Sequence, residues 1–184
     1  MEKVYRHNVV FNKAFPAQPK EGWIDGTNLY SRLNDIIRGT IVCKYLDGPP
    51  FVCGKLKTYG DELGIACRFY PMNTERGYHS WHFYASHNVE FFDDKGGVQM
   101  KPVELEIQIT TQLADVMTTL THELYKGERV LPKGQGDDTW KWSPDSPRFR
   151  STYTGHTLHL VESIILALKN EVVAAQAEGK EPKK

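Results

Sequence analysis

The sequence lacks the glycine-rich and nucleophile motifs of the common nucleotide-binding and hydrolase folds. No GxGxxG, GxxxxGK[ST] or GxSxG occurs in the 184 residues, so neither a Rossmann site, a P-loop nor an α/β-hydrolase serine is expected. No apolar run approaches the roughly 18 to 20 residues that span a bilayer. The start, MEKVYRHNVV, carries no secretory pattern. We therefore expect a cytoplasmic protein without a membrane partner.

Cysteine is scarce, and neither sign of charge is in excess. The three cysteines are an odd number, at spacings that match neither a CxxC metal site nor a disulfide framework. We expect them to be reduced and structural. Lysine plus arginine equals aspartate plus glutamate at 23 each, so net charge does not indicate a nucleic-acid partner. Local clusters could still bind phosphate.

The length predicts one domain with a real core. Prolines and glycines with little periodicity indicate an N-terminal arm over residues 1–27. A single domain, which includes a C-terminal helix, is expected over residues 28–176. The charged residues 177–184 are typical of a disordered tail.

The order of periodic segments favours an α+β fold. We expect a mixed, mainly antiparallel β-sheet of about five strands flanked by helices. The expected elements are a short helix at 28–34, a strand at 35–45, a helix at 51–64, a strand at 65–69, a pair of strands within 77–92, a hairpin into 103–111, a helix from 111 capped by Thr110 or Thr111, a polar loop at 127–150 and a second long helix carrying Leu158 to Val172.

The stretch VELEIQITT, residues 103–111, alternates with a period of two. Val103 and Ile109 fall on the apolar side of an extended chain, whereas Glu104, Glu106 and Gln108 fall on the polar side. The polar side could be a solvated face or the floor of a reaction site.

An aspartate and an arginine lie at the start of the first predicted strand. Asp35 could hold a magnesium ion through one or two contacts, while Arg38 could bind substrate phosphates bidentately. Taken alone, an aspartate before a strand is more often a turn residue. Likewise Tyr78, which follows the turn glycine Gly77, could stack on a base or simply pack against its neighbours.

Histidines gather in several stretches. His79 and His82 lie three positions apart on a predicted strand, where side chains face opposite ways, so a shared metal ion is not expected. His156 and His159, one helical turn apart, could pair on a ligand, or one could hydrogen-bond a neighbouring element. His122 lies opposite the apolar stripe of its helix, where a solvated face is the plain interpretation.

In this order the segments resemble a known family. DIIRGTIVC at 35–43, GYHSWH at 77–82, EIQITT at 106–111 and His122 with Tyr125-Lys126 resemble the synthetase domain of RelA/SpoT-type alarmone synthetases. That family runs from an Asp-led strand through GYRSLH to EIQIRT and a helix ending in a His and a Tyr-Lys pair. The resemblance covers roughly residues 28–126 and implies the nucleotidyltransferase-like synthetase fold of a small, stand-alone synthetase or a related toxin-like member.

What the resemblance implies is ATP-dependent transfer of the β,γ-pyrophosphate to the 3′-hydroxyl of GDP or GTP, giving (p)ppGpp, with Mg²⁺ as cofactor. Asp35 and Glu106 look like the catalytic, metal-binding pair, and Glu106 would contact and activate the attacking hydroxyl. Tyr78 looks like the residue that stacks on the acceptor base. Gln108 and His122 look like wall residues of the acceptor site.

Two positions depart from the family pattern. His79 and Thr110 stand where the family has arginine, so a ring and a hydroxyl replace fixed positive charges. His79 is nevertheless expected among the nucleotide-binding residues. The basic segment that grips ATP in the family is hardly recognisable, and its available substitutes are Lys13, Arg32, Arg38 and Lys44.

Three functions therefore stay open. The first is a pyrophosphokinase acting on a purine nucleotide. The second is a toxin-like member that pyrophosphorylates adenosine nucleotides or the 3′ end of tRNA, which would require a basic surface leading to the site. The third is a nucleotide-binding module without catalysis. An antitoxin or a second copy of the chain could bind the long C-terminal helix.

Overall fold

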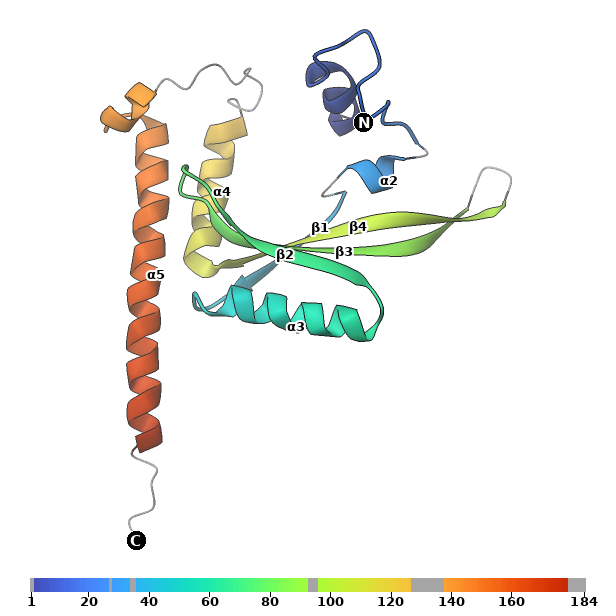
Figure 1. Ribbon diagram of the computed structural model, residues 1–184. Helices are drawn as coiled ribbons and strands as arrows, with labels where there is room; N and C mark the ends of the chain where they lie inside the picture. The colour runs from blue at the N-terminus through green and yellow to red at the C-terminus, as the bar shows by residue number, and fades with distance from the viewer. Residues whose placement is uncertain (1, 27, 34–35, 93–95, 127–137, 179–184) are drawn as a thin grey trace. The chain divides into compact units, whose positions relative to one another are not determined.

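A computed structural model describes residues 2–26, 28–33, 36–92, 96–126 and 138–178 of the protein (Figure 1). Its elements are α1 Glu2–Tyr5, the π-helical turn η1 Arg6–Val10, α2 Leu29–Arg32, β1 Ile37–Cys43, α3 Gly48–Glu62, β2 Ala66–Asn73, β3 His79–Phe92, β4 Val98–Thr111, α4 Gln112–Lys126, the 3₁₀ turn η3 Asp138–Trp142 and α5 Pro147–Glu178. Within the described residues no helix is both long and apolar enough to cross a bilayer.

The described strands form one four-stranded sheet in the order β1-β4-β3-β2. Strands β1 and β2 are the two edges, so α3, which joins them along the chain, connects opposite sides of the sheet. The predicted α+β class is confirmed. The expected number of about five strands is wrong, because the described residues supply four.

The stretch HSWHFYASHNVEFF is one strand and not a pair. β3 runs without a break for 14 residues, and β4 has the same length. Small residues such as Ala85 and Ser86 favour an interruption, but no glycine or proline stands there to make a turn. The strand therefore continues beside its equally long neighbour, which satisfies the backbone groups of both.

Prolines and a serine mark the first residues of helices α3 and α5. The helix predicted at 51–64 is confirmed as α3, although it starts earlier, because Pro49 and Pro50 fit a first turn that needs no amide donors. Helix α5 starts at Pro147 after Ser146, whose hydroxyl accepts a hydrogen bond of 3.1 Å from the Phe149 amide. Residues 147–150, predicted to be loop, are therefore helical.

The predicted cap of α4 is also confirmed. The Thr111 hydroxyl accepts a hydrogen bond of 3.4 Å from the Ala114 amide, three residues into the helix. The chain thus turns from strand to helix within one residue of the EIQITT segment.

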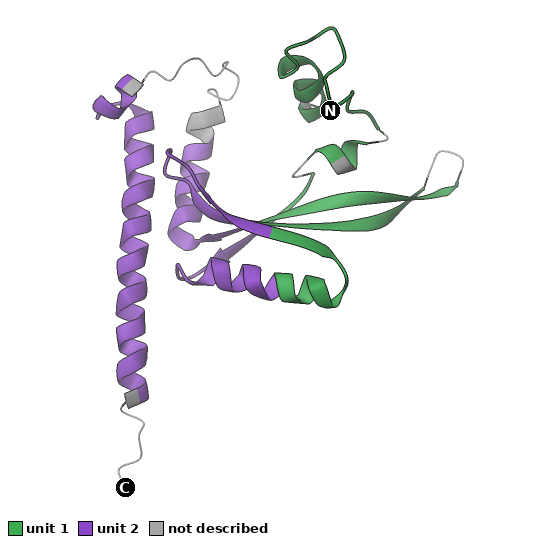
Figure 2. Ribbon diagram, viewed as in Figure 1, with its two compact units in different colours: residues 1–39, 57–68, 83–107 green, residues 40–56, 69–82, 108–184 purple. Residues whose placement is uncertain are grey.

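The chain divides into two compact units (Figure 2). Unit 1 comprises Met1–Gly39, Lys57–Arg68 and Phe83–Ile107, and unit 2 comprises Thr40–Leu56, Phe69–His82 and Gln108–Lys184. Buried apolar side chains of unit 1 are Ile24, Leu33, Phe83, Tyr84 and Val103. In unit 2, Cys53 and Ile109 are fully enclosed.

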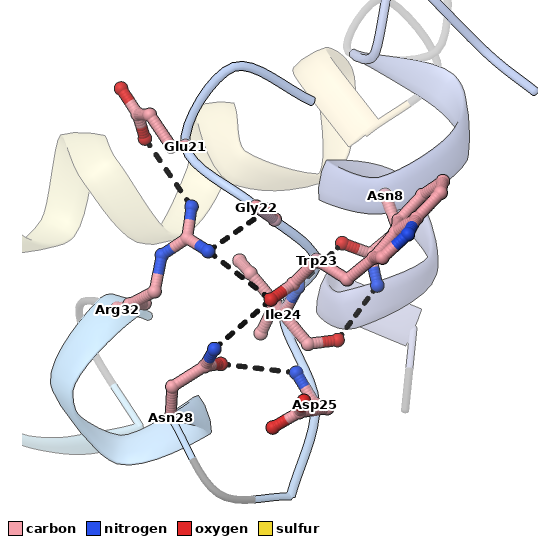
Figure 3. A network of polar contacts seen from close by, with 8 residues as sticks. All are labelled: Asn8, Glu21, Gly22, Trp23, Ile24, Asp25, Asn28 and Arg32. Carbon is pink, nitrogen blue, oxygen red and sulfur yellow. Dashed lines mark hydrogen bonds and ion pairs between the residues drawn. The ribbon is translucent and has the colours of Figure 1, made fainter. Parts of the chain in front are cut away.

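The N-terminal arm of unit 1 is held by its own polar side chains (Figure 3). The Asn8 amide donates to the Ile24 carbonyl at 2.7 Å and accepts from the Ile24 amide at 2.9 Å, as a neighbouring strand would. The Arg32 guanidinium donates to the carbonyls of Gly22 and Trp23 at 3.0 and 3.2 Å. These bonds give the proline-rich arm a defined path between η1 and α2.

Two glycines allow a close approach within unit 2. Gly77 has φ of +75°, and a Cβ placed there would lie 2.4 Å from the Thr152 carbonyl oxygen of α5. A Cβ on Gly155 would lie 2.4 Å from the Gly77 carbonyl oxygen. The turn before β3 therefore rests directly on the backbone of α5, which only glycine permits.

Replacing Gly77 by alanine should lower the free energy of unfolding by about 2 to 4 kcal/mol, because both the positive φ and the clash with α5 oppose a side chain. Gly64→Ala is the matched control, since its φ is +68° and nothing lies within 4 Å of its Cβ position. That control should cost about 1 kcal/mol. Equal losses for the two variants in urea unfolding would contradict the close approach.

Candidate functional site

The polar side of β4 is covered and is not a solvated face. Glu106 is only 5% exposed, although it lies on the polar side predicted from VELEIQITT. Burying a carboxylate is costly unless cations or hydrogen-bond donors compensate it. Of the two interpretations of this stretch, the structure therefore favours an enclosed polar floor around Glu106.

The Lys3 side chain lies within electrostatic range of both Glu106 and Arg38. The pKa of Lys3 is lowered, first by burial and then by the neighbouring Arg38, while the Glu106 carboxylate acts to raise it. Lys3 comes from α1 and Arg38 from the edge strand β1, which pairs with β4. Three charged groups from distant parts of the sequence thus meet at one place.

The neighbouring Glu104 is already paired. Its carboxylate contacts the Arg68 guanidinium at 2.5 Å, and that guanidinium also lies 4.4 Å from the centre of the Tyr84 ring. Glu104 is thus paired with Arg68, whereas Glu106 interacts electrostatically with Lys3. Asp35, the other predicted metal ligand, lies outside the described residues.

In unit 2, Tyr78 is fixed by a histidine. Its hydroxyl lies 3.0 Å from Nε2 of His82, and the two rings stand edge to face at 87°. His82 is buried and Tyr78 half-buried. The tyrosine ring predicted to stack on a base is therefore held in one orientation from its hydroxyl end.

His79 packs into a group of histidines on the side of β3 away from His82. Its ring stacks on that of His159 at 3.9 Å with an angle of 5° between planes, and its Nε2 lies 3.2 Å from Nδ1 of His156. His156 Nε2 also lies 3.3 Å from the Glu75 carbonyl oxygen. The two helix histidines thus bind a neighbouring element, which was the plainer of their two interpretations.

This packing keeps His79 uncharged. Burial, followed by repulsion from His159 and His156, lowers the pKa of His79 to about 4. Its Nδ1 lies 3.2 Å from the Asn73 side-chain oxygen. A neutral His79 supplies no positive charge to a phosphate, and its predicted role in nucleotide binding would have to be that of a polar ring.

A pocket of about 240 Å³ lies beside these rings in unit 2. It is lined by Leu46, Pro49, Pro71, Asn73, His79, Ser80, Trp81, Thr110, Thr111 and His159. No lysine, arginine, aspartate or glutamate is among these lining residues. The pocket therefore suits an uncharged, partly polar group such as a base or a sugar edge better than a phosphate.

The other predicted binding residues are more scattered. Lys44 is exposed and borders a smaller hollow of about 220 Å³ together with the buried Glu162. Gln108 is half-buried on β4, and His122 is exposed on α4. In unit 1 the structure thus places Arg38 and Glu106 around Lys3, and in unit 2 it places His79 on β3 and Tyr78 in the turn before it.

Sequence reasoning missed Lys3, Arg68 and Asn73. Lys3 and Arg68 act through partners far along the chain, and no spacing rule connects, for example, Lys3 with Glu106. Asn73 contacts the nearby His79 across the turn before β3. Among the described residues no three His, Cys, Asp or Glu side chains come together as a ready metal site. The cysteines are free, as predicted, and burial raises the pKa of Cys53 to about 11.

The low pKa of His79 predicts acid sensitivity. The unfolded chain binds the proton near pH 6.5, whereas folded His79 resists it down to about pH 4. Stability should therefore fall as the pH drops through that window, by about 1 to 3 kcal/mol after allowance for solvent screening. Denaturant unfolding between pH 7 and 4 should show this slope in the wild type and a flatter one in His79→Gln. The exposed His87→Gln should keep the wild-type slope, and identical slopes in all three proteins would contradict the low pKa of His79.

Comparison with known proteins supports the fold. No family model matches the sequence, and no curated protein sequence does either. A solved GTP pyrophosphokinase family protein from Streptococcus pneumoniae matches with a TM-score of 0.59 and 22% identity, over 86% of this chain and 70% of that one. Protein smu.1046c from Streptococcus mutans UA159 matches with a TM-score of 0.56 and 18% identity, over 83% and 70%.

A weaker likeness, with a TM-score of 0.48 and 18% identity, is to the small alarmone synthetase 1 from Bacillus subtilis bound to its product pppGpp. It covers 73% of this chain and 61% of that one. At 22% and 18% identity, the two matches with TM-scores of 0.59 and 0.56 show a shared fold. The fold implied by the sequence resemblance is therefore confirmed.

Proposed function

We propose that the protein is an ATP-dependent pyrophosphokinase that transfers the β,γ-pyrophosphate of ATP to the 3′-hydroxyl of a purine nucleotide. The observation that carries the proposal is the buried Glu106 carboxylate within electrostatic range of Lys3, which Arg38 also neighbours. The fold shared with a GTP pyrophosphokinase family protein supports the same reaction class. GDP and GTP are the acceptors that the sequence resemblance favours.

Pyrophosphate transfer requires a proton acceptor and positive charge close together. The acceptor oxygen forms a bond to the β-phosphorus of ATP. The bond from that phosphorus to the oxygen that bridges the α- and β-phosphates breaks, and AMP leaves. Glu106 would accept the hydroxyl proton or a strong hydrogen bond from it. Lys3 and Arg38 would attract the phosphate oxygens, whose charge the reaction redistributes.

Magnesium is the cofactor that we propose, with Glu106 and Asp35 as its carboxylate ligands. Mg²⁺ is usually held by one or two carboxylates together with substrate phosphates, so a ready three-ligand site is not required. Glu106 provides one carboxylate, and Asp35 would provide the other. When bound, the ion would neutralise charge on the transferred group.

The acceptor side of the reaction relies on rings and few charges, which are what unit 2 offers. Tyr78 has a ring held at its hydroxyl end by His82, as a stacking residue requires. The neutral pocket beside His79 favours contacts with a base or sugar. Adenosine nucleotides or the 3′ end of tRNA would present the same groups and belong in any acceptor screen.

The variant Glu106→Gln should lower the rate of transfer by about 10²- to 10⁴-fold, because the amide cannot accept the proton. Transfer is measured with γ-labelled ATP and magnesium, separately with GDP, GTP, ADP, ATP and tRNA as acceptors. Glu104→Gln, two residues along the same strand, is the matched control and should lose less than about tenfold. Labelling by Glu106→Gln at the wild-type rate would refute the assigned role. Nucleotide binding without any labelled acceptor would favour the non-catalytic module.

Removing the ring of Tyr78 should weaken binding of the acceptor and leave binding of ATP unchanged. Tyr78→Ala is expected to lose about 1 to 3 kcal/mol of acceptor binding, the usual worth of one stacked base. Tyr78→Phe keeps the ring without its contact to His82 and should stay close to wild type. Calorimetric titration with each nucleotide measures both affinities, and unchanged acceptor binding in the alanine variant would mean that Tyr78 is merely packed.

A further inference from the structure

Helix α5 holds a buried carboxylate that the proposed reaction does not use. Glu162 is only 7% exposed. Among the described residues its one ionic contact is with His159, whose Nδ1 lies 3.9 Å from a carboxylate oxygen. That distance is too long for a hydrogen bond. Because burying a carboxylate is costly without a partner, a cationic group from outside the chain could stabilise Glu162.

Glu162 lines a hollow of about 220 Å³, which we call the Glu162 hollow. All of its lining residues belong to unit 2, which is purple in Figure 2. It shares only Leu46 with the pocket beside His79. Its other walls come from the chain after β1, the start of α4 and one further residue of α5, namely Lys44, Tyr45, Leu46, Gln112, Leu113 and Ile165.

The Glu162 hollow also has a positive charge in its wall. Lys44 is exposed, and its Nζ lies 5.4 Å from the centre of the Tyr45 ring. Within the described part of the chain Lys44 pairs with no carboxylate, so it forms no salt bridge with Glu162 across the hollow. Lys169, which lies 4.8 Å from the same ring, differs because Asp47 pairs with it at 2.6 Å. The hollow therefore offers two opposite charges that are not matched to each other.

The start of α4 adds donors for an anionic group. Gln112 and Leu113 are the first two residues of this helix and line the hollow. Backbone amides in a first helical turn have no partner within the helix, and the helix dipole places partial positive charge there. The cap from Thr111 serves the amide of Ala114. A ligand carboxylate is therefore favoured both by Lys44 and by the start of α4.

The remaining walls are apolar, and the space is small. Leu46, Leu113 and Ile165 supply aliphatic surface beside the ring of Tyr45. Pockets for drug-sized ligands measure about 300 to 1,000 Å³, so this one suits a molecule of about ten non-hydrogen atoms. The ligand should therefore combine a compact polar end with a short apolar chain.

We propose that the Glu162 hollow binds a free α-amino acid with an aliphatic side chain. Its ammonium group would pair with Glu162, its carboxylate with Lys44 and the first amides of α4, and its side chain would pack against Leu46, Leu113 and Ile165. An α-amino acid carries both charges on one carbon, so it satisfies both charged side chains at once. The inference does not depend on the proposed reaction.

The buried carboxylate argues against a phosphate at this place. A phosphate near Lys44 would also lie beside the negative charge of Glu162, which repels it in surroundings where charges are weakly screened. An amine without a carboxylate would leave Lys44 unmatched, and a carboxylic acid without an amine would leave Glu162 unmatched. The zwitterion is the ligand class that fits both.

Calorimetric titration of the purified full chain with leucine tests the proposal. We expect a dissociation constant below about 1 mM. Two analogues separate the charges, because 4-methylpentanoic acid is leucine without its amino group and 3-methylbutylamine is leucine without its carboxylate. Each should bind at least about tenfold more weakly than leucine. Glycine keeps both charges without the side chain and should also bind at least about tenfold more weakly.

Glu162→Gln removes the charge and keeps the size of the side chain. It should weaken leucine binding by at least about tenfold and leave binding of 4-methylpentanoic acid undiminished. Glu171→Gln makes the same change at an exposed position of α5 and should bind leucine as the wild type does. Circular dichroism verifies folding. Should Glu162→Gln fail to fold, Lys44→Gln should weaken leucine binding about threefold or more without weakening binding of 3-methylbutylamine.

Several results would overturn the proposal. One is the absence of leucine binding to the wild type at about 10 mM ligand. Another is binding of either analogue or of glycine as tightly as leucine, which would mean that one charge or the polar end alone is recognised. The last are wild-type leucine affinity in folded Glu162→Gln or in Lys44→Gln, and an equal loss in Glu171→Gln.

Discussion

The burial of the Glu106 charge on an interior strand is the constraint that organises unit 1. An ionised carboxylate removed from water must be compensated by positive charge or by hydrogen bonds. Lys3 from the first helix lies within its electrostatic range, and Arg38 from the edge strand acts on the same Lys3. The hydrogen bonds of Asn8 to Ile24 and of Arg32 to the carbonyls of Gly22 and Trp23 hold the described part of the arm in place.

The pocket of unit 2 follows a different chemistry, because no lysine, arginine, aspartate or glutamate lines it. Burial, followed by repulsion from His159 and His156, lowers the pKa of His79 to about 4 and keeps that ring uncharged. Rings and hydroxyls at such a place can read the edge and face of a base, whereas phosphates need the cations of unit 1.

The sequence predicted what local patterns determine. Alternation marked β4 and its enclosed glutamate, and the periodicity of α4 together with Thr111 located that helix and its cap. Contacts between distant segments could not be predicted this way, because no spacing joins Lys3 to Glu106. The length of β3 was missed for a related reason, since pairing with an equally long β4 overrides weak local breaks.

The identity of the adenine product tests the central claim most directly. Transfer of the β,γ-pyrophosphate releases AMP, whereas transfer of the γ-phosphate alone would release ADP. Chromatographic quantification of a single turnover with ATP, magnesium and GDP or GTP should yield one AMP for each acceptor that gains two phosphates. Formation of ADP, or AMP without a modified acceptor, would contradict the proposed reaction.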